Sequence, residues 1–205
     1  MIAIIDYGVG NLFSLRSSFA AIGEEAVVTR DPGEIRSAER ILLPGVGAFA
    51  DAAEKLRSTG MADVVLSEAV KGKPLLGVCL GMQLLFEKSY EYGEHDGLGL
   101  LKGRVVPLRG YVPEELKIPQ MGWNSLEMVN DPGPLLKYVK NGDFVYFVHS
   151  YYAADCGDSV IAVTDYGAPV TAAVQKGNVF GCQFHPEKSG DVGLGILRAF
   201  CEVPA

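Results

Sequence analysis

The sequence predicts an α/β protein with a mostly parallel sheet, helices on both faces of that sheet, and antiparallel strands added in its second half. Up to about residue 100, short apolar runs alternate with segments whose apolar residues recur at helical spacing. Beyond that point, strand-like runs follow one another through turn-rich links. The chain of 205 residues shows no linker-like stretch and no internal repeat, so we expect a single domain spanning residues 1–205.

The first half carries the alternation that a parallel sheet requires. Strands are predicted at residues 2–5, 26–29, 40–43 and 74–78, and helices at residues 12–22, 49–57, 61–71 and from 80 onward. The first strand is apolar at every position, as expected for a strand buried on both faces. Asn11 is expected to cap the following helix and Gly23 to end it. Strands that alternate with helices imply right-handed crossovers and a sheet covered on both faces.

The second half is predicted to consist mainly of strands. These are expected at residues 104–108, 144–148, 160–164, 170–175 and 179–184, with a final helix at residues 192–201. Gly122 and Asn124 indicate a turn around Trp123, so this only tryptophan is either a packed core residue or an aromatic that faces a partner. His95 lies in a polar, turn-like stretch and is assigned no role.

The bulk composition narrows the classes of function. The formal net charge of −7 argues against a large basic surface for nucleic acid or anionic membranes. The longest apolar runs are far too short to cross a bilayer, and Met1 leads directly into a strand-like run without a basic segment. We therefore expect a cytoplasmic protein that binds neither nucleic acid nor a membrane.

The cysteines do not form a metal-binding or disulfide pattern. They stand at Cys79, Cys156, Cys182 and Cys201. Because there is no C-x-x-C pair and no histidine spacing suited to zinc, we expect reduced thiols, no metal site and no cofactor. A buried, inert thiol is the ordinary interpretation of each, and the neighbouring residues change that interpretation only for Cys79.

Cys79 stands between Gly77 and Gly81 where a predicted strand passes into a predicted helix. A nucleophile at such a junction sits on a sharp turn, with its side chain lifted clear of the sheet, and small flanking residues let other backbone pass closely. The helix that begins at Leu80 is expected to favour the thiolate through its dipole. The Leu80 amide, which follows the nucleophile, is placed to donate to an oxyanion.

A thiolate nucleophile needs a base and a group that orients the base. His185 follows a strand-like run, and Glu187 lies two residues further on. On an extended segment, residues at this spacing project to the same side, so the Glu187 carboxylate is expected to hold the His185 imidazole and stabilise its charged form. The sequence thus predicts a Cys79–His185–Glu187 triad.

The segments Gly-Val-Cys-Leu-Gly-Met-Gln at 77–83 and His-Pro-Glu at 185–187 resemble the class I, triad-type glutamine amidotransferases. The resemblance implies a flavodoxin-like sheet with added antiparallel strands, and hydrolysis of the glutamine side-chain amide through a cysteinyl thioester. It further implies that Cys79 is the nucleophile, His185 the general base and then acid, and Glu187 the orienting group, while Gln83 helps to hold the substrate.

The loop Leu-Pro-Gly-Val-Gly at 43–47 follows a predicted strand, and its glycines permit backbone conformations that expose amide groups. By the same resemblance, Val46 and Gly47 pair with the Leu80 amide to form the oxyanion hole. Ala48 departs from the family pattern, which often has a larger polar residue there. A contact made by that side chain in relatives is therefore not expected in this chain.

Further segments narrow the resemblance. Residues 6–11, 44–49, 119–124 and 146–151 resemble the glutaminase subunits of imidazole glycerol phosphate synthases, so that the resemblance covers residues 2–200. It implies L-glutamine as substrate and a heterodimer with a separate (β/α)8 cyclase subunit, which uses the ammonia to form imidazole glycerol phosphate and an aminoimidazole carboxamide ribonucleotide in histidine biosynthesis. We expect His149 and Ser150 to contact glutamine, and Trp123 and Lys188 to face the cyclase.

Three alternatives remain open at the level of sequence. The chain could serve another synthase, of the pyridoxal phosphate or aminodeoxychorismate type, although the former usually has a Gly-Gly-Glu-Ser loop in place of Pro-Gly-Val-Gly. It could be a thiol hydrolase of similar fold, although those commonly place a histidine directly after the nucleophile, where this chain has Leu80. A non-catalytic protein that keeps the fold is disfavoured because all three triad residues are present.

Overall fold

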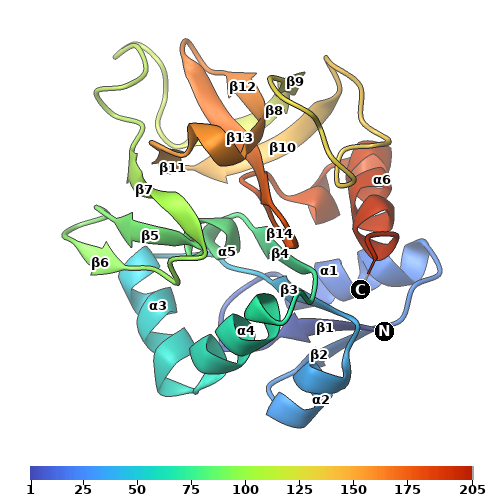
Figure 1. The fold of residues 1–205 in the computed structure, drawn as a ribbon. Helices are drawn as coiled ribbons and strands as arrows, with labels where there is room; N and C mark the ends of the chain where they lie inside the picture. Colours follow the sequence, from blue (N-terminus) through green and yellow to red (C-terminus); the bar gives the residue numbers. More distant parts are fainter. Residues whose placement is uncertain (205) are drawn as a thin grey trace.

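The computed structural model describes residues 1–204, whose helices and strands are labelled in Figure 1. The helices are α1 (Leu12–Ala21), α2 (Pro32–Ser37), α3 (Phe49–Ser58), α4 (Met61–Val70), α5 (Leu80–Gln83) and α6 (Gly190–Cys201), with 3-10 turns η1 (Gly157–Ser159) and η2 (Pro186–Lys188). The strands are β1 (Ile2–Ile5), β2 (Ala26–Thr29), β3 (Arg40–Leu43), β4 (Leu75–Val78), β5 (Phe86–Ser89), β6 (His95–Asp96), β7 (Leu101–Pro107), β8 (Gln120–Ser125), β9 (Glu127–Met128), β10 (Phe144–His149), β11 (Tyr151–Ala154), β12 (Val160–Asp165), β13 (Pro169–Lys176) and β14 (Val179–Cys182).

The main sheet has the order β2-β1-β3-β4-β14-β13-β12-β9 within residues 1–204. Its first five strands are parallel, and β13, β12 and β9 extend it in antiparallel fashion. The predicted α/β class, with a parallel sheet and later antiparallel strands, is therefore confirmed. The carboxyl ends of β3, β4 and β14 lie side by side, which brings three distant loops to one edge of the sheet.

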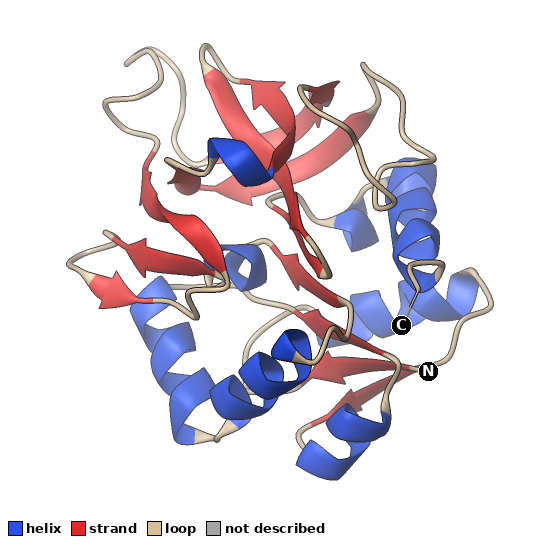
Figure 2. Ribbon diagram, in the orientation of Figure 1, coloured by secondary structure: helices blue, strands red, loops and turns tan. Residues whose placement is uncertain are grey.

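The parallel strands inside the sheet are buried on both faces, whereas the edge strand β2 is only partly buried. Alternate residues of β1 belong to different apolar clusters: Ile2 and Ile4 pack with α1 and α6, whereas Ala3 and Ile5 pack with α2, α3 and α4. Figure 2 shows the helices gathered around the parallel strands, while the antiparallel half is mainly strand and loop. This two-sided cover explains why these strands are apolar at nearly every position.

The antiparallel half differs in detail from the sequence prediction. Residues around Trp123 form β8 rather than a turn, because β8 pairs with β10 along its whole length and Trp123 lies opposite Tyr146. Gly122 takes a positive φ of 134° within this strand, so it reshapes the ribbon without ending it. Besides the main sheet and the β10–β8 pair, the described chain has a four-stranded sheet in the order β11-β7-β5-β6, and His95 lies in its edge strand.

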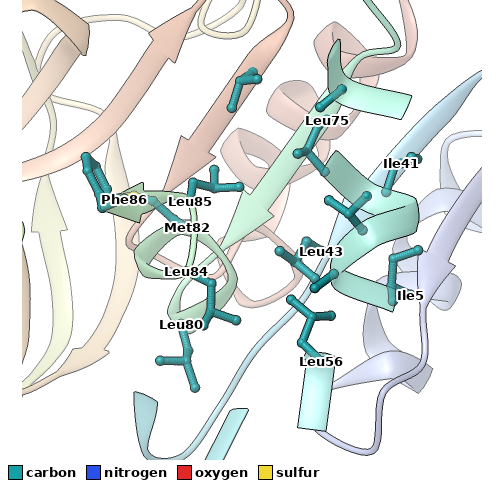
Figure 3. Close-up of a cluster of buried hydrophobic side chains, with 14 of the residues drawn as sticks. Ile5, Ile41, Leu43, Leu56, Leu75, Leu80, Met82, Leu84, Leu85 and Phe86 are labelled. Carbon is teal, nitrogen blue, oxygen red and sulfur yellow. The ribbon is translucent and has the colours of Figure 1, made fainter. Parts of the chain in front are cut away.

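The helix predicted from residue 80 onward is only one turn long. The chain leaves α5 after Gln83, and Phe86 begins β5, which pairs with β7. Leu80, Leu84 and Phe86 belong to the same buried cluster as Leu43 (Figure 3), so the apolar spacing serves a compact turn and the start of β5 rather than a long helix. A four-residue helix has a small dipole, which weakens the expectation that the dipole activates Cys79.

The helix α2 was missed because it is short, although its start carries a recognisable signal. Asp31 accepts hydrogen bonds from the amides of Gly33 and Glu34, at 2.6 and 3.0 Å, and Pro32 occupies the first helical position. In the part of the chain that the structure describes, none of the helices is both long and apolar enough to cross a membrane.

Candidate active site

Cys79 occupies a strained turn at the carboxyl end of β4. Its backbone has φ 54° and ψ −113°, a conformation that non-glycine residues rarely adopt. The turn is held from both sides, because the Cys79 amide donates to the Cys182 carbonyl at 2.8 Å and the Cys79 carbonyl accepts from the Gln83 amide at 3.1 Å. The predicted sharp strand-to-helix junction is therefore confirmed.

The glycines around this turn are required by close backbone packing. A Cβ added at Gly81 would lie 1.9 Å from the carbonyl oxygen of Leu43, and one at Gly77 would lie 2.7 Å from the Met82 Cα. A Cβ at Gly45 would lie 2.6 Å from the Gly81 amide nitrogen. The glycine loop after β3 and the first turn of α5 thus touch through their backbones. This contact brings the predicted oxyanion loop against the amide end of α5.

His185 and Glu187 form the predicted pair, but not on an extended segment. Glu187 lies in the 3-10 turn η2, for which His185 is the residue before the first turn position. The His185 Nδ1 lies 2.9 Å from the Glu187 Oε1, and both side chains are almost fully buried. The prediction that the two residues pair is confirmed, although a tight turn rather than strand alternation brings them together.

The turn that carries His185 is held by hydrogen bonds from other elements. The His185 amide donates to the Tyr146 carbonyl of β10 at 2.9 Å. The Ser189 hydroxyl donates to the His185 carbonyl at 2.6 Å and accepts from the Tyr146 amide at 3.0 Å. The backbone of His185 is therefore fastened to β10 as well as to its own strand.

Asn11 has a different role from the one predicted. Among the described residues, its side chain makes no capping hydrogen bond to α1. Instead, the Asn11 Nδ2 donates to the Glu187 Oε1 at 3.4 Å, across 176 residues of chain. The Asn11 side chain thus serves as a donor to a buried carboxylate rather than as an acceptor for the first amides of α1. Sequence reasoning missed this contact because no local pattern signals it.

The surroundings of His185 favour its charged form. Burial by itself lowers the pKa of His185, but the adjacent Cys79 sulfur and Glu187 carboxylate outweigh burial and raise this pKa to about 9. Within residues 1–204, the His185 Nε2 has no hydrogen-bond partner and is shielded from solvent. The imidazole therefore keeps one nitrogen for Glu187 and leaves the other for a group in the cavity beside Cys79.

A cavity of about 320 Å³ opens at this point and collects most of the predicted site residues. Its walls include Val46, Gly47, Cys79, Leu80, Gln83, His149, Ser150 and His185. Glu187 lies behind His185 rather than in the wall. The volume suits a small molecule of amino-acid size, and the reactive sulfur and the imidazole share the same space.

His149 forms part of the cavity wall as a neutral imidazole. Burial lowers the pKa of His149 to about 4, and the neighbouring His185 acts in the same direction. The His149 Nδ1 lies 2.9 Å from the Tyr151 carbonyl, which makes Nδ1 the protonated nitrogen and leaves Nε2 as an acceptor. Within the described chain this Nε2 is buried and unpartnered. His149 therefore offers a hydrogen-bond acceptor rather than a charge.

Gln83 is buried in the same wall with its amide hydrogens already engaged. Its Nε2 donates to the Tyr151 carbonyl at 3.0 Å and to the Gln183 Oε1 at 2.9 Å. A substrate can therefore meet Gln83 only through its carbonyl oxygen. Gln183 in turn donates from its Nε2 to the Cys79 sulfur at 3.7 Å.

The cavity wall also contains residues that sequence reasoning missed, namely Glu91, Pro119, Val148 and Tyr151. Glu91 brings a carboxylate to the wall, and its Oε2 accepts from the Phe49 amide at 2.7 Å. It thereby supplies the cap at the start of α3 that the Ala48 side chain is unable to give. Neither a motif nor a spacing in the sequence indicates Glu91, because the fold alone brings the chain after β5 to the start of α3.

The predicted oxyanion loop forms the rim of the cavity. Val46 and Gly47 are exposed there, and Gly47 has a positive φ of 97°. The loop is anchored at its start, because the buried Tyr7 hydroxyl donates to the Pro44 carbonyl at 2.6 Å. Leu80 is the first residue of α5, so its amide lies among those for which the helix supplies no acceptor.

The two residues predicted to face a partner lie outside the cavity. Trp123 is 52% exposed, so it is not a core residue. Trp123 packs edge-on against the Tyr146 ring, and the Lys188 ammonium lies over the same ring, 5.6 Å from its centroid. Trp123, Tyr146 and Lys188 therefore form one continuous surface beside the catalytic turn. Residues 1–204 contain no group of three or more histidine, cysteine or acidic side chains arranged to hold a metal.

A cysteine on a strained turn, an imidazole held by a carboxylate, and backbone amides at the rim of one small cavity define a thiol-dependent amidohydrolase on an open α/β sheet. The family model described as "Glutamine amidotransferase class-I" matches residues 3–202. The chain belongs to this family and, at 53% identity to a curated HisH subunit of imidazole glycerol phosphate synthase over 99% of its length, to the HisH subunits within it.

Curated relatives match over nearly the full length. "Imidazole glycerol phosphate synthase subunit HisH" of Caldanaerobacter subterraneus subsp. tengcongensis is 53% identical, over 99% of this chain and 98% of the relative. The subunit of the same name from Wolinella succinogenes is 48% identical, over 99% and 100%. That of Lactococcus lactis is 49% identical, over 98% of each. The alternatives of a different synthase or an unrelated thiol hydrolase are thereby disfavoured.

Solved structures support the fold. A structure described as "Crystal structure of glutamine amidotransferase" superposes with a TM-score of 0.75 at 20% identity, covering 98% of this chain and 100% of that one. PurLQS from Thermotoga maritima gives a TM-score of 0.72 at 22% identity, covering 98% and 96%. At such low sequence identity these structural similarities show the fold alone.

Proposed function

We propose that this chain hydrolyses L-glutamine to glutamate and ammonia through a thioester on Cys79, and that it supplies the ammonia to a separate cyclase subunit. The observation that carries the proposal is the meeting of the Cys79 sulfur, the free nitrogen of His185 and the glycine loop around one cavity. Membership of the HisH family supports the choice of synthase. The reaction is that of histidine biosynthesis, and we assign it to the cytoplasm.

In the first half of the reaction, the Cys79 thiolate attacks the side-chain amide carbon of glutamine while His185 carries the proton. The tetrahedral oxyanion is stabilised by backbone amides of Leu80 and of the loop at Val46 and Gly47. His185 then gives its proton to the leaving nitrogen, which departs as ammonia and leaves the thioester. A His185 pKa of about 9 suits this donor role at neutral pH.

In the second half, a water molecule replaces ammonia beside His185. The imidazole, now neutral, takes a proton from this water as it attacks the thioester carbon, and the same amides stabilise the second oxyanion. The C–S bond breaks, glutamate leaves, and the sulfur returns to the thiolate beside protonated His185. Glu187 holds the imidazole orientation throughout and remains ionised.

The polar groups of the cavity wall match the amino-acid end of glutamine. We assign the α-ammonium group to the Glu91 carboxylate and the Gln83 carbonyl oxygen, since both are acceptors in the wall. His149 and Ser150 line the wall on the side of β10 and β11, where they contact the substrate. These groups select a ligand whose positive charge lies at the end remote from the amide that Cys79 attacks.

The partner is a (β/α)8 cyclase subunit that forms imidazole glycerol phosphate and an aminoimidazole carboxamide ribonucleotide from the ammonia. We assign its docking surface to Trp123, Tyr146 and Lys188, because an exposed aromatic beside a basic side chain is typical of an interface hot spot. We also treat residues 1–205 as one glutaminase domain, since both termini contribute to the same buried cluster.

Steady-state glutaminase assays test the proposal in three arms: this chain alone, with the cyclase, and with the cyclase and its nucleotide. We expect slow hydrolysis that rises with each addition. The change Cys79→Ala abolishes hydrolysis, His185→Ala lowers kcat by roughly 10³-fold or more, and the double variant is barely worse, because triad members act as a unit. Additive losses would show that His185 is structural, and an activity that neither addition changes would refute coupling to a cyclase.

A further inference from the structure

Gln183 is a fully buried amide that the triad mechanism does not use. It directly follows β14 and is 0% exposed, and its backbone amide donates to the Ala172 carbonyl at 2.8 Å. Its side chain reaches the catalytic turn, where the Nε2 donates to the Cys79 sulfur at 3.7 Å. A polar side chain without any exposure is retained only where its hydrogen bonds are satisfied.

The orientation of the Gln183 amide is determined by a chain of hydrogen bonds. The Tyr151 carbonyl can only accept, so the nitrogen of Gln83 must face it, at 3.0 Å. The same nitrogen donates to the Gln183 Oε1 at 2.9 Å. With its oxygen taken up in this way, Gln183 must present its N–H groups to Cys79. The donor at the sulfur is thus specified by three residues that come from different elements.

We propose that Gln183 is a further catalytic residue, whose side-chain N–H stabilises the Cys79 thiolate. A hydrogen bond to an anion is stronger than one to a neutral thiol, and burial strengthens it further. The amide does not titrate, so this donor acts on the sulfur even when His185 has lost its proton. The inference deepens the proposed function, since it concerns the same nucleophile.

Several ionisable groups share the surroundings of the sulfur and are taken into account. His185 is the proton partner, and His149 lines the same cavity in its neutral form. Burial raises the pKa of Tyr7 and of Cys182, and the charge on Cys79 raises both further. Tyr7 and Cys182 therefore stay protonated and neutral beside the thiolate, and Glu91 lies elsewhere in the cavity wall.

The change Gln183→Met tests the proposal because it keeps the length and volume of the side chain and removes the donor. The pH profile of Cys79 alkylation by iodoacetamide reports the thiolate directly. We expect the alkylation profile to move to higher pH by about one unit and kcat for glutamine to fall about tenfold, with a much smaller change in KM. Gln175→Met is the matched control, since Gln175 lies on β13 outside the catalytic cavity, and its profile should match wild type.

An alkylation profile of Gln183→Met that coincides with wild type would overturn the proposal, even if kcat fell, because the residue would then be structural. A second measurement needs no Gln183 variant. In the wild-type protein, the NMR signals of the Gln183 side-chain amide should move with the ionisation of Cys79, and this movement should vanish in Cys79→Ala. Side-chain amide signals of Gln183 that do not change with the ionisation of Cys79 would also overturn the proposal.

The alkylation assay contains no glutamine, so it separates this inference from the proposed function. A protein that fails to hydrolyse glutamine but shows the shifted profile in Gln183→Met refutes the proposed substrate and supports the thiolate donor. An active glutaminase with an unshifted profile in the variant supports the substrate and refutes the donor.

Discussion

Two turns meet at the carboxyl end of the parallel sheet, and they are held in place by different means. The nucleophile turn, residues 77–83, is fixed by backbone packing, since glycines let it lie against the end of β3 without room for a Cβ. The base turn, residues 183–189, is also packed by backbone, since a Cβ at Gly193 would lie 1.9 Å from the Pro186 carbonyl oxygen. Its reactive group, however, is held by side chains: Glu187 pairs with the His185 imidazole, Asn11 donates to Glu187, and Ser189 fastens the backbone to β10.

The difference matches the demands on each group. The nucleophile must approach the substrate carbon and the oxyanion amides in one geometry, so a rigid backbone at a strained φ serves it. The base must pass a proton between two partners during the reaction, which calls for a stable orientation and a tuned pKa rather than a strained backbone. Changes in the nucleophile turn should therefore act through the fold, and changes in the base turn through rate and pH.

The largest effect is expected from Gly81→Ala. The new Cβ would lie 1.9 Å from the Leu43 carbonyl oxygen, so β3 or α5 must move. We expect a loss of more than about 3 kcal/mol in the free energy of unfolding, measured by denaturant titration, together with loss of glutaminase activity. Gly157→Ala is the control, because a Cβ there meets no atom within 4 Å. Equal stability of the two variants would contradict the backbone-packing account.

A second prediction concerns pH and the base turn. The pKa of His185 is raised to about 9, so the imidazole is protonated at neutral pH. The protonated imidazole contributes fully to the stability of the fold below the ordinary histidine pKa of 6.5, and this contribution is lost as the pH rises through about 9. Hydrolysis should fall about tenfold per pH unit above that value, because the leaving ammonia lacks a proton donor.

An NMR titration of His185 checks the origin of this alkaline limb. The Cys79 sulfur is the largest of the contributions that raise the pKa of His185, so Cys79→Ala should lower the His185 midpoint. A wild-type midpoint near 6.5, or one that does not respond to Cys79→Ala, would show that the two turns are not electrostatically coupled.

The smallest effect is expected from Asn11→Ala. This change removes a long hydrogen bond of 3.4 Å to Glu187 and leaves the closer His185–Glu187 contact intact. We expect kcat to fall by a few-fold, on the order of 1 kcal/mol, with KM and stability nearly unchanged. Asn130→Ala is a matched control, since Asn130 also donates from its Nδ2, to the Val160 carbonyl, but lies outside the catalytic cavity. A loss of rate equal in both variants would deny Asn11 a role in orienting the triad.

The sequence by itself determined the parallel part of the sheet and singled out Cys79, His185 and Glu187 as candidate reactive residues. Periodicity located β1 to β4 and the helices α1, α3 and α4, but not the short α2, because strands buried on both faces must be apolar throughout and longer crossover helices must be amphipathic. The glycines beside Cys79 marked the nucleophile turn, since their spacing reflects a local steric requirement. The close spacing of His185 and Glu187 allowed their pairing to be predicted, although the geometry assumed for it was wrong.

Only the tertiary structure decided which distant groups complete the site. The Asn11–Glu187 contact spans 176 residues and the Gln83–Gln183 contact spans 100, so neither leaves a periodic or local signal. Glu91 reaches the cavity because β5 pairs with β7 after a single turn of α5, where the apolar spacing indicated a longer helix. Local sequence patterns encode which face of a helix or strand is buried. The hydrogen-bond partners in the site depend instead on how the loops at the carboxyl ends of β1, β4 and β14 pack together, and that packing is a property of the whole fold.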